Sequence, residues 1–508
     1  MRRTSPRSRR RRAPWRCAQE STDLAPVTSG EERAARLEKL FALERRHDFF
    51  SYRADGWSAW RVMRNPVYWR VADLPFSKPA RPIYIRILEA LRGTLGALWL
   101  LIASRKKDLL IKTCRSALRT KHGDKYEDLH FDSLLRRGYS CVKLEEINSS
   151  DFKVQAAAAW RPSDLNPVVF TFWGRVLGRL FPADAMPFCR FVAEHLQSEL
   201  QVAVDPRWLQ MRLSTVIWQA KLYGALLARI KPRAVLVSDT GEYGLRIATH
   251  RANIRFIEVQ HGVFDATQPD AIPLWVEGSG AELVLPDVLA IRGSYWMKKL
   301  AATRQGRDHA VAVGDAMTDS ARARRAAKVS DGRIRLVLTS QGLDTERLVA
   351  WIGELARAAP PSLDWHLSIK LHPIYDSSPE KFDALKSHAR IRIISGAEQP
   401  NVFDLLADSD LHLTIASACH FDAGAIGVRS VIIPLDGHEL LMDTVDGRLF
   451  YRAASPRDVW DIVASPPSFD SAESDHFSAP GYVDNLAALL PASSLDSCRR
   501  QLQESLGH

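Results

Sequence analysis

The stretch Ala234–Gly262, AVLVSDTGEYGLRIATHRANIRFIEVQHG, decides the fold prediction. It reads as a buried strand, a polar turn with two acids and two glycines, a short helix, and a second strand (Ile254–Val259) that runs into Gln260-His261-Gly262. Both polar clusters therefore come at the carboxyl ends of strands. In an open parallel sheet this edge binds ligands, because the loops diverge there and the N-termini of helices face it.

The second half of the chain repeats this arrangement with greater regularity. Strands and short helices alternate, which is typical of βαβ units and of a parallel sheet. Right-handed crossovers then place every polar strand end at one edge. The predicted strands are Ile334–Thr339, Trp365–Leu371, Ile391–Ile394, Leu411–Ile415 and Ser430–Pro434. The fold class is therefore α/β, with two Rossmann-like domains whose parallel sheets face each other across a cleft.

The chain divides into five predicted segments. A disordered basic tail covers residues 1–30, and a helical N-terminal extension covers 31–107. The N-terminal Rossmann-like domain, expected to bind the acceptor, covers 108–328. The C-terminal Rossmann-like domain, expected to bind a nucleotide, covers 329–490, and a C-terminal tail covers 491–508.

The positive charge of the chain belongs mainly to its N-terminal tail. The formal net charge is +11, and eight arginines lie within the first sixteen residues without any acid. The rest of the chain therefore carries only 11 − 8 = +3. A tail rich in Arg, Ser and Pro cannot bury enough apolar surface to fold. We expect no specific nucleic-acid partner, although a nucleic-acid-binding protein is an alternative that rests on this tail alone.

Cysteine usage and hydropathy bear on the cellular compartment. The six cysteines include no C-x-x-C pair, which excludes an ordinary zinc site and favours a reducing compartment. No run reaches the roughly 20 apolar residues of a membrane span, so we expect a cytoplasmic protein. Ile83–Ala103 is apolar with interspersed charges and precedes Arg105-Lys106-Lys107. It is either a core helix or an interfacial helix in peripheral contact with the inner membrane.

Two strand ends in the second half suit a phosphate group. In LSIKLHP, alternation places Lys370 and His372 on one face, and Pro373 ends the strand so that the imidazole lies at its mouth. Both side chains can neutralise phosphate, although a solvated face is the alternative. Thr339-Ser340-Gln341-Gly342 follows a buried strand and precedes a helix, a setting where N–H groups and hydroxyls receive phosphate.

Other nucleotide-binding motifs are missing from the sequence. There is no G-x-x-x-x-G-K-[ST] motif, and no G-x-G-x-x-G follows the first strand, which disfavours a nicotinamide dehydrogenase. A third strand end, TIASACHFDAG, places Ser417 at a helix start, where it could meet a phosphate, and Asp422 on that helix, where it could hold ribose hydroxyls. A plain N-cap and an exposed acid are the alternative.

The order of these motifs carries a resemblance. The chain has, in this order, an acidic turn and strand-QHG, then TSQG, then KLHP, then T-x-x-S followed by an acid-Ala pair and GVRSVIIP. In this order the motifs resemble those of bacterial surface-polysaccharide glycosyltransferases of the two-domain GT-B type. That group includes capsule transferases, polysialyltransferase-like enzymes and the glycerophosphotransferases of teichoic acid synthesis. The resemblance covers about residues 108–465, and the order and spacing carry it rather than any one motif.

The resemblance implies a donor site in the C-terminal half. His372 and Ser340 or Ser417 would hold the nucleotide phosphates, with Gln341 and Lys370 beside them. The group has a glutamate at the ribose position, where this chain has Asp422, and Ala418 stands where threonine is common. The implied activity is transfer of a sugar from a nucleotide sugar to a surface-polysaccharide or lipid-linked acceptor in cell-envelope biosynthesis, without a metal ion or a resident cofactor.

Glycosyl transfer also needs a base to deprotonate the acceptor hydroxyl. Asp239, Glu242 and His261 are the candidates, and Asp239 and His261 are preferred because each follows a buried strand. A polyol-phosphate transferase and a sugar-nucleotide epimerase remain alternatives, because the fold alone does not separate them.

Overall fold

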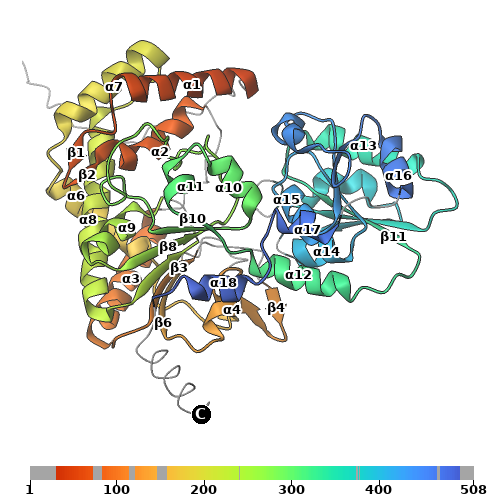
Figure 1. Cartoon of the computed structure of the whole chain (residues 1–508), viewed down its shortest axis with the longest axis horizontal. Helices are drawn as coiled ribbons and strands as arrows, with labels where there is room; N and C mark the ends of the chain where they lie inside the picture. The colour runs from red at the N-terminus through yellow and green to blue at the C-terminus, as the bar shows by residue number, and fades with distance from the viewer. Residues whose placement is uncertain are drawn as a thin grey trace, which may run out of the picture.

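The computed structural model describes residues 30–72, 83–103, 105–113, 120–145, 157–238, 241–372, 376, 378–396, 398–465 and 470–491. The chain forms two α/β domains that lie side by side, each on a six-stranded sheet (Figure 1). The predicted fold class is therefore confirmed, including the helical N-terminal extension. Nearly all of the two predicted tails lies outside the described residues.

The first sheet has the strand order β10-β9-β8-β7-β3-β6, and every pair in it is parallel. Three of its inner strands, β3, β7 and β9, are buried along their whole length, which explains why they read as largely apolar runs. The strands are β3 (Leu109–Thr113), β6 (Cys141–Glu145), β7 (Ala234–Val237), β8 (Arg255–Val259), β9 (Val288–Ile291) and β10 (Ala310–Ala312).

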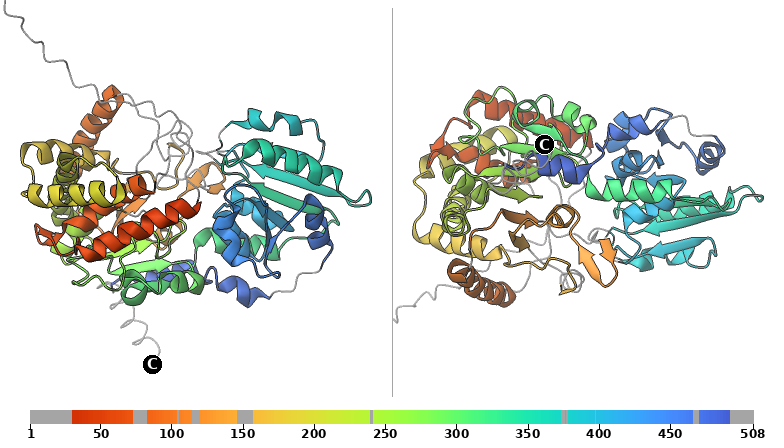
Figure 2. Two further views of the ribbon diagram at one scale, coloured as in Figure 1. Left: turned by 90° about the horizontal axis from the view of Figure 1, so that it is seen from above. Right: turned by 60° about the horizontal axis from the view of Figure 1, so that its bottom comes forward.

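Helices cover both faces of this sheet (Figure 2). The long helix α8 starts at Pro206 behind the N-cap Asp205, whose side chain accepts a hydrogen bond from the Arg207 amide. The helices of this domain are α4 (Asp132–Leu135), α6 (Val168–Leu180), α7 (Met186–Leu200), α8 (Pro206–Ile230), α9 (Tyr243–Arg251), α10 (Ser294–Leu300) and α11 (Arg304–Asp308). A small hairpin, β4 (Thr120–His122) with β5 (Lys125–Glu127), was not predicted.

The N-terminal extension is anchored by buried ion pairs. It comprises α1 (Gly30–Arg46), the short strands β1 (Arg53–Ala54) and β2 (Trp57–Ser58), and α2 (Ala59–Val71). Arg64 contacts Glu44 at 2.6 Å, and Arg61 contacts Asp270 of the first domain at 3.0 Å, with all four side chains at most 7% exposed. Since each buried charge has a partner, the extension is part of the first domain's core.

Helix α3 (Ile83–Ala103) packs on only one side. A Cβ at Gly93 would lie 3.0 Å from the Val169 side chain of α6, so glycine permits this close approach. The opposite side is exposed, with Leu95, Trp99 and Ile102 at 70%, 68% and 72%. The reading of this segment as a core helix is therefore wrong, and its apolar stripe faces outward.

The second sheet has the strand order β13-β12-β11-β14-β15-β16 and is also parallel throughout. Its strands are β11 (Ile334–Thr339), β12 (Trp365–Lys370), β13 (Ile391–Ile394), β14 (Leu411–Thr414), β15 (Arg429–Ile432) and β16 (Phe450–Arg452). The helical elements are α13 (Thr345–Arg357), η1 (Pro379–Leu385), α14 (Val402–Asp408), α15 (Cys419–Ile426), η2 (His438–Thr444), α16 (Pro456–Ala464) and α17 (Ser471–Asp475). The predicted strands lie here within two residues of their observed ends, and β16 was not predicted.

Two helices pack on the domain other than the one that their place in the sequence suggests. Helix α12 (Ala316–Ala326) was assigned to the first domain, but Met317 and Ala321 join a core cluster with Val337 and Phe403 of the second. Helix α18 (Tyr482–Ala488) was assigned to the second domain, yet it packs beside α4 under the first sheet (Figure 1). The apolar residues of these short helices are buried in the core that lies nearest in space, which need not be the core nearest in the sequence.

No helix among the described residues is long and apolar enough to span a membrane.

Candidate active site

A cavity of about 320 Å³ lies between the two domains, at the carboxyl edges of both sheets. Its second-domain wall includes every predicted donor-binding residue, namely Ser340, Gln341, Lys370, His372, Ser417 and Asp422. The structure brings these side chains together because β11 pairs in parallel with both β12 and β14, and Thr339 is in register with Lys370 and Thr414. The loops after the three strands therefore share one edge.

Ser340 presents a hydroxyl group to this cavity. The residue is 3% exposed, and its Oγ atom has no hydrogen-bond partner among the described residues. The Ser340 amide donates to the Lys370 carbonyl at 3.0 Å, which fixes the turn after β11. A buried hydroxyl without a partner carries a desolvation cost that a ligand can remove.

Lys370 forms hydrogen bonds to the loop after β13. Its Nζ donates to the carbonyl oxygens of Ser395 at 2.8 Å and Glu398 at 2.5 Å. Burial lowers its pKa to about 8, with a smaller opposing effect from the Glu398 carboxylate. Lys370 thus orders the loop after β13 while adding a positive charge to the cavity wall.

His372 follows β12 directly and is neutral near pH 7. Burial lowers the pKa of its imidazole, although the nearby Asp376 carboxylate opposes this shift. A neutral ring can offer one N–H and one lone pair, so His372 suits a hydrogen bond to phosphate better than an ion pair.

Ser417 and Asp422 lie at the start of α15. The N-cap residue of α15 is Ala418, and the Ser417 Oγ accepts a hydrogen bond from the Cys419 amide at 3.2 Å. Asp422 forms a close ion pair with Arg292 of the first domain, and Arg292 also lies 3.7 Å from Asp315. Burial disfavours the Arg292 charge, but Asp422 and Asp315 outweigh it and raise the Arg292 pKa. One carboxylate oxygen of Asp422 is therefore engaged in joining the domains.

A buried chain of hydrogen bonds supports the turn after β11. His412 contacts Thr339 Oγ1 at 2.9 Å and Ser430 Oγ at 2.7 Å, and His420 contacts Ser430 Oγ at 2.8 Å and Thr444 Oγ1 at 2.8 Å. Burial lowers the His412 pKa to about 3, so that ring is neutral. A fully connected polar network rigidifies its surroundings, and here it fixes Thr339 beside the cavity.

His261 lies at the opposite wall of the cavity. It is exposed and also borders a smaller cavity of about 180 Å³ in the first domain. Its neighbour Gln260 joins two loops, because Oε1 accepts from the Arg292 amide at 3.0 Å and Nε2 donates to the Gly262 carbonyl at 2.8 Å. The QHG motif therefore positions both His261 and Arg292.

Three ionisable residues of the first domain that border the cavity were not predicted, namely His130, Arg292 and Asp315. Burial lowers the pKa of His130, and the charges of Asp128 and Asp315 oppose this shift. Arg292 and Asp315 follow β9 and β10 closely, so the pattern of a polar residue after a strand could have identified both as cavity residues. His130 precedes a four-residue helix and offers no comparable pattern.

Glu242 lies away from His261. It is the N-cap residue of α9 and pairs closely with Lys112, at the end of β3, where both border a third cavity of about 540 Å³. Glu242 was the least favoured candidate base, and its contact with Lys112 leaves it engaged at this other cavity. Asp239, the other acid of the turn, lies outside the described residues.

No protein-family model matches the chain, and no curated protein sequence matches it. The fold is that of a protein with two Rossmann-like domains, each built on a six-stranded parallel sheet. Among solved structures, a UDP-GlcNAc 2-epimerase from Neisseria meningitidis bound to UDP-GlcNAc is similar, with 13% identity and a TM-score of 0.46 over 75% of this chain and 98% of that one.

Two further structures are transfer or polymerisation proteins. The wall teichoic acid polymerase TagF is 11% identical, with a TM-score of 0.44 over 84% of this chain and 100% of that one. The glycosyltransferase of kitacinnamycin is 13% identical, with a TM-score of 0.42 over 76% of this chain and 100% of that one. These likenesses are distant, and they transfer neither an activity nor a ligand to this chain.

Proposed function

We propose that this protein is a glycosyltransferase that moves a sugar from a nucleotide-sugar donor to a hydroxyl group of a surface-polysaccharide or lipid-linked acceptor. The observation that carries the proposal is the cavity between the domains. In it, Ser340, His372 and Ser417 of the second domain face His261 and Arg292 of the first. Donor and acceptor can meet between two such walls because the reacting groups are then held in one place.

The donor diphosphate binds at the strand ends of the second domain. The Ser340 hydroxyl donates to a phosphate oxygen, as does a ring N–H of the neutral His372, while Lys370 adds positive charge. Asp422 accepts from ribose hydroxyls through the oxygen that does not bind Arg292. These contacts stabilise the negative charge that develops on the departing diphosphate.

The acceptor is activated from the first domain. A ring nitrogen of His261 takes the proton of the acceptor hydroxyl, whose oxygen forms a bond to the anomeric carbon of the sugar. The bond between that carbon and the phosphate oxygen breaks, and the nucleoside diphosphate leaves with the electron pair. Asp239 remains the proposed partner of His261. Glu242 is the least favoured of the candidate bases, because it already pairs with Lys112. The scheme requires no metal ion and no resident cofactor.

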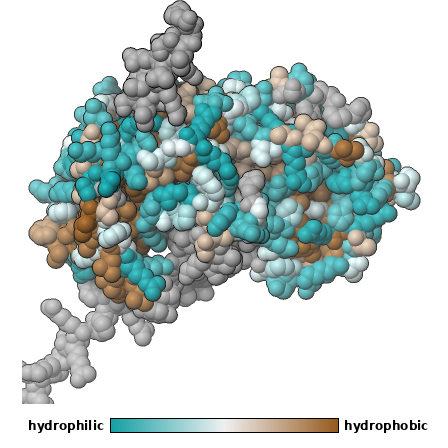
Figure 3. All heavy atoms as spheres, turned by 90° about the horizontal axis from the view of Figure 1, so that it is seen from below, coloured by the Kyte–Doolittle hydropathy of each residue, from teal (hydrophilic) through white to brown (hydrophobic). Residues whose placement is uncertain are grey.

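A lipid-linked acceptor is supported by the surface beside α3. The exposed stripe Leu95, Trp99 and Ile102 is followed by Arg105-Lys106-Lys107. Figure 3 shows hydrophobic residues gathered toward the lower left, on the N-terminal domain. An apolar stripe with adjacent basic residues suits an interfacial helix on an anionic leaflet. We therefore propose peripheral contact with the inner membrane from the cytoplasmic side.

A polar cavity lies close to this helix. The cavity of about 540 Å³ is bordered by Glu89 of α3, Arg175 of α6 and Arg212 of α8. The Arg212 Nε is buried and has no hydrogen-bond partner among the described residues. A phosphate of a lipid carrier would find cationic groups here while its chain remained at the α3 surface.

The test of the function has two stages. A panel of nucleotide sugars is first screened for thermal stabilisation, because a bound ligand raises the unfolding temperature. The stabilising donor is then incubated with and without lipid-linked oligosaccharide acceptors. Sugar transfer with release of nucleoside diphosphate supports the proposal. Transfer of a polyol-phosphate instead of a sugar, with release of nucleoside monophosphate, indicates a polyol-phosphate transferase, and acceptor-independent conversion of the donor indicates an epimerase; either result overturns it.

A further inference from the structure

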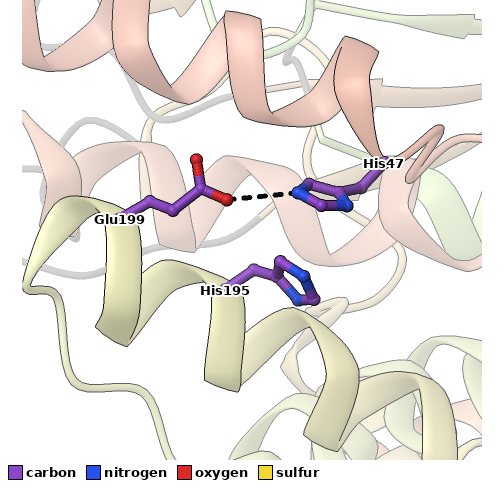
Figure 4. Close-up of side chains that lie close together, drawn as sticks. All are labelled: His47, His195 and Glu199. Atoms are coloured by element: carbon purple, nitrogen blue, oxygen red, sulfur yellow. Dashed lines mark hydrogen bonds and ion pairs between the residues drawn. The ribbon is translucent and has the colours of Figure 1, made fainter.

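A cluster of two histidines and one glutamate lies where α1 meets α7 (Figure 4). His47 follows the last residue of α1, and His195 and Glu199 lie one turn apart on α7. Residues four apart on a helix share a face, so the two α7 side chains both point toward His47. None of the three borders the cavity between the domains.

The spacing of these side chains suits a small metal ion. Their ligand atoms all lie within 4.8 Å of one another, and His47 Nε2 is 3.1 Å from Glu199 Oε1. In a tetrahedral zinc site with bonds of about 2.0–2.1 Å, neighbouring ligand atoms are about 3.3 Å apart. The ligand atoms of His47 and Glu199 already have nearly that separation. A rotation of the His195 ring would bring its ring nitrogen to a similar distance from them.

The surrounding hydrogen bonds orient two of the three ligands. His195 Nδ1 lies 2.8 Å from the Phe191 carbonyl oxygen, which can only accept. Nδ1 therefore carries the hydrogen, and the lone pair is on Nε2. The second Glu199 oxygen accepts from Arg46 Nη1 at 2.5 Å, so the first oxygen is directed at the cluster. Metal-binding histidines and carboxylates are typically held by such outer contacts.

We propose that His47, His195 and Glu199 bind one Zn²⁺ ion that fastens the N-terminal extension to α7. Two imidazoles and a carboxylate suit zinc better than magnesium or calcium, which prefer oxygen ligands alone. Glu199 is exposed, so a water molecule can take the fourth position. The aromatic ring of Phe191 packs edge-on against His47, with ring centroids 5.8 Å apart. The site is independent of the proposed transferase activity.

Such a site escapes motif searching. The sequence has no C-x-x-C pair, and the ligands here come from positions about 150 residues apart. Only His195 and Glu199 are close in the sequence, and a His-x-x-x-Glu pair is common on helices without a metal.

The experiment uses the full chain without a polyhistidine tag, stripped of metal by a chelator. Isothermal titration with Zn²⁺ should show one ion per chain, and Zn²⁺ but not Mg²⁺ should raise the unfolding temperature by several degrees. His195→Ala and Glu199→Gln should each weaken zinc binding at least tenfold. His366→Ala, which removes a histidine of β12 in the second domain, should bind zinc as the parent does.

Two results would overturn the proposal. One is a parent protein that binds no zinc in the micromolar range, which would leave the cluster as an ion pair beside a histidine. The other is equal zinc binding by the parent, His195→Ala and Glu199→Gln. Far-ultraviolet circular dichroism of each metal-free variant shows whether it is folded, and the Glu199→Gln change, which keeps the side-chain volume, tests the site if His195→Ala does not fold.

Discussion

Removing the Ser340 hydroxyl is the sharpest test of the donor site. The Ser340 side chain borders the cavity and is almost fully buried, and its Oγ lacks a hydrogen-bond partner among the described residues. Ser340→Ala deletes this one atom and leaves the backbone hydrogen bond to Lys370 in place. Its effects on folding and on binding should therefore have opposite signs.

The magnitudes follow from the hydroxyl's surroundings. In the free protein the hydroxyl is desolvated without compensation, so Ser340→Ala should leave the free energy of unfolding unchanged or raise it by up to about 1 kcal/mol. In the complex, a hydrogen bond to a charged phosphate contributes about 1.5–3 kcal/mol. Its loss should weaken donor binding by about 10- to 150-fold.

The assay measures both quantities on the same variant. Isothermal titration with the stabilising nucleotide sugar gives Kd, and urea unfolding gives the free energy of unfolding. Ser368→Ala is the matched control, because Ser368 lies on β12 and does not border the cavity. Should Ser340→Ala bind the donor within twofold of the parent, the hydroxyl does not contact phosphate. A loss of more than about 1 kcal/mol in stability would instead mean that the hydroxyl has a structural role.

Four further predictions concern other residues. His372→Ala should weaken donor binding by about 1.5–3 kcal/mol in titration calorimetry, equally at pH 7 and pH 8, because burial lowers the His372 pKa and keeps the ring neutral; unchanged affinity contradicts the assignment. His261→Ala should reduce turnover about 10²- to 10⁴-fold at unchanged donor Kd, and near-parental turnover with the true acceptor would make His261 structural. The unfolded chain holds its Lys370 proton up to the ordinary pKa of 10.5, while the folded chain loses it near pH 8. Between these two pH values the free energy of unfolding should therefore increase with pH. Lys370→Met should lack this increase in urea titrations, and an identical pH slope for variant and parent would refute the prediction. Trp99→Glu should reduce flotation with anionic liposomes at low salt, and parental protein that does not float would exclude the membrane contact.

Much of the second-domain wall could be predicted from local sequence. Polar residues directly after buried strands, at Ser340, Lys370–His372 and Ser417, were expected at one edge, and they border one cavity. The reason is general, because right-handed crossovers align the carboxyl ends of parallel strands. A residue that follows a strand therefore has a predictable place before the tertiary structure is known.

The sequence did not predict the contacts of residues whose neighbours come from distant segments of the chain. Asp422 was expected to be available to ribose, but Arg292, 130 positions earlier, binds one of its oxygens. Glu242 was a candidate base, but it pairs with Lys112 at another cavity. Such pairings depend on which charged groups become neighbours after folding, and strand periodicity carries no information about that choice.

By itself, then, the sequence determined two parallel sheets and the edge at which their polar residues gather, because alternating strands and helices leave a chain few other ways to bury its apolar positions. The tertiary structure alone decided that α12 and α18 exchange domains, that one side of α3 stays exposed, and that His47 of the extension meets His195 and Glu199. These outcomes depend on the packing of surfaces far apart in the sequence, where the shape of each partner selects the contact.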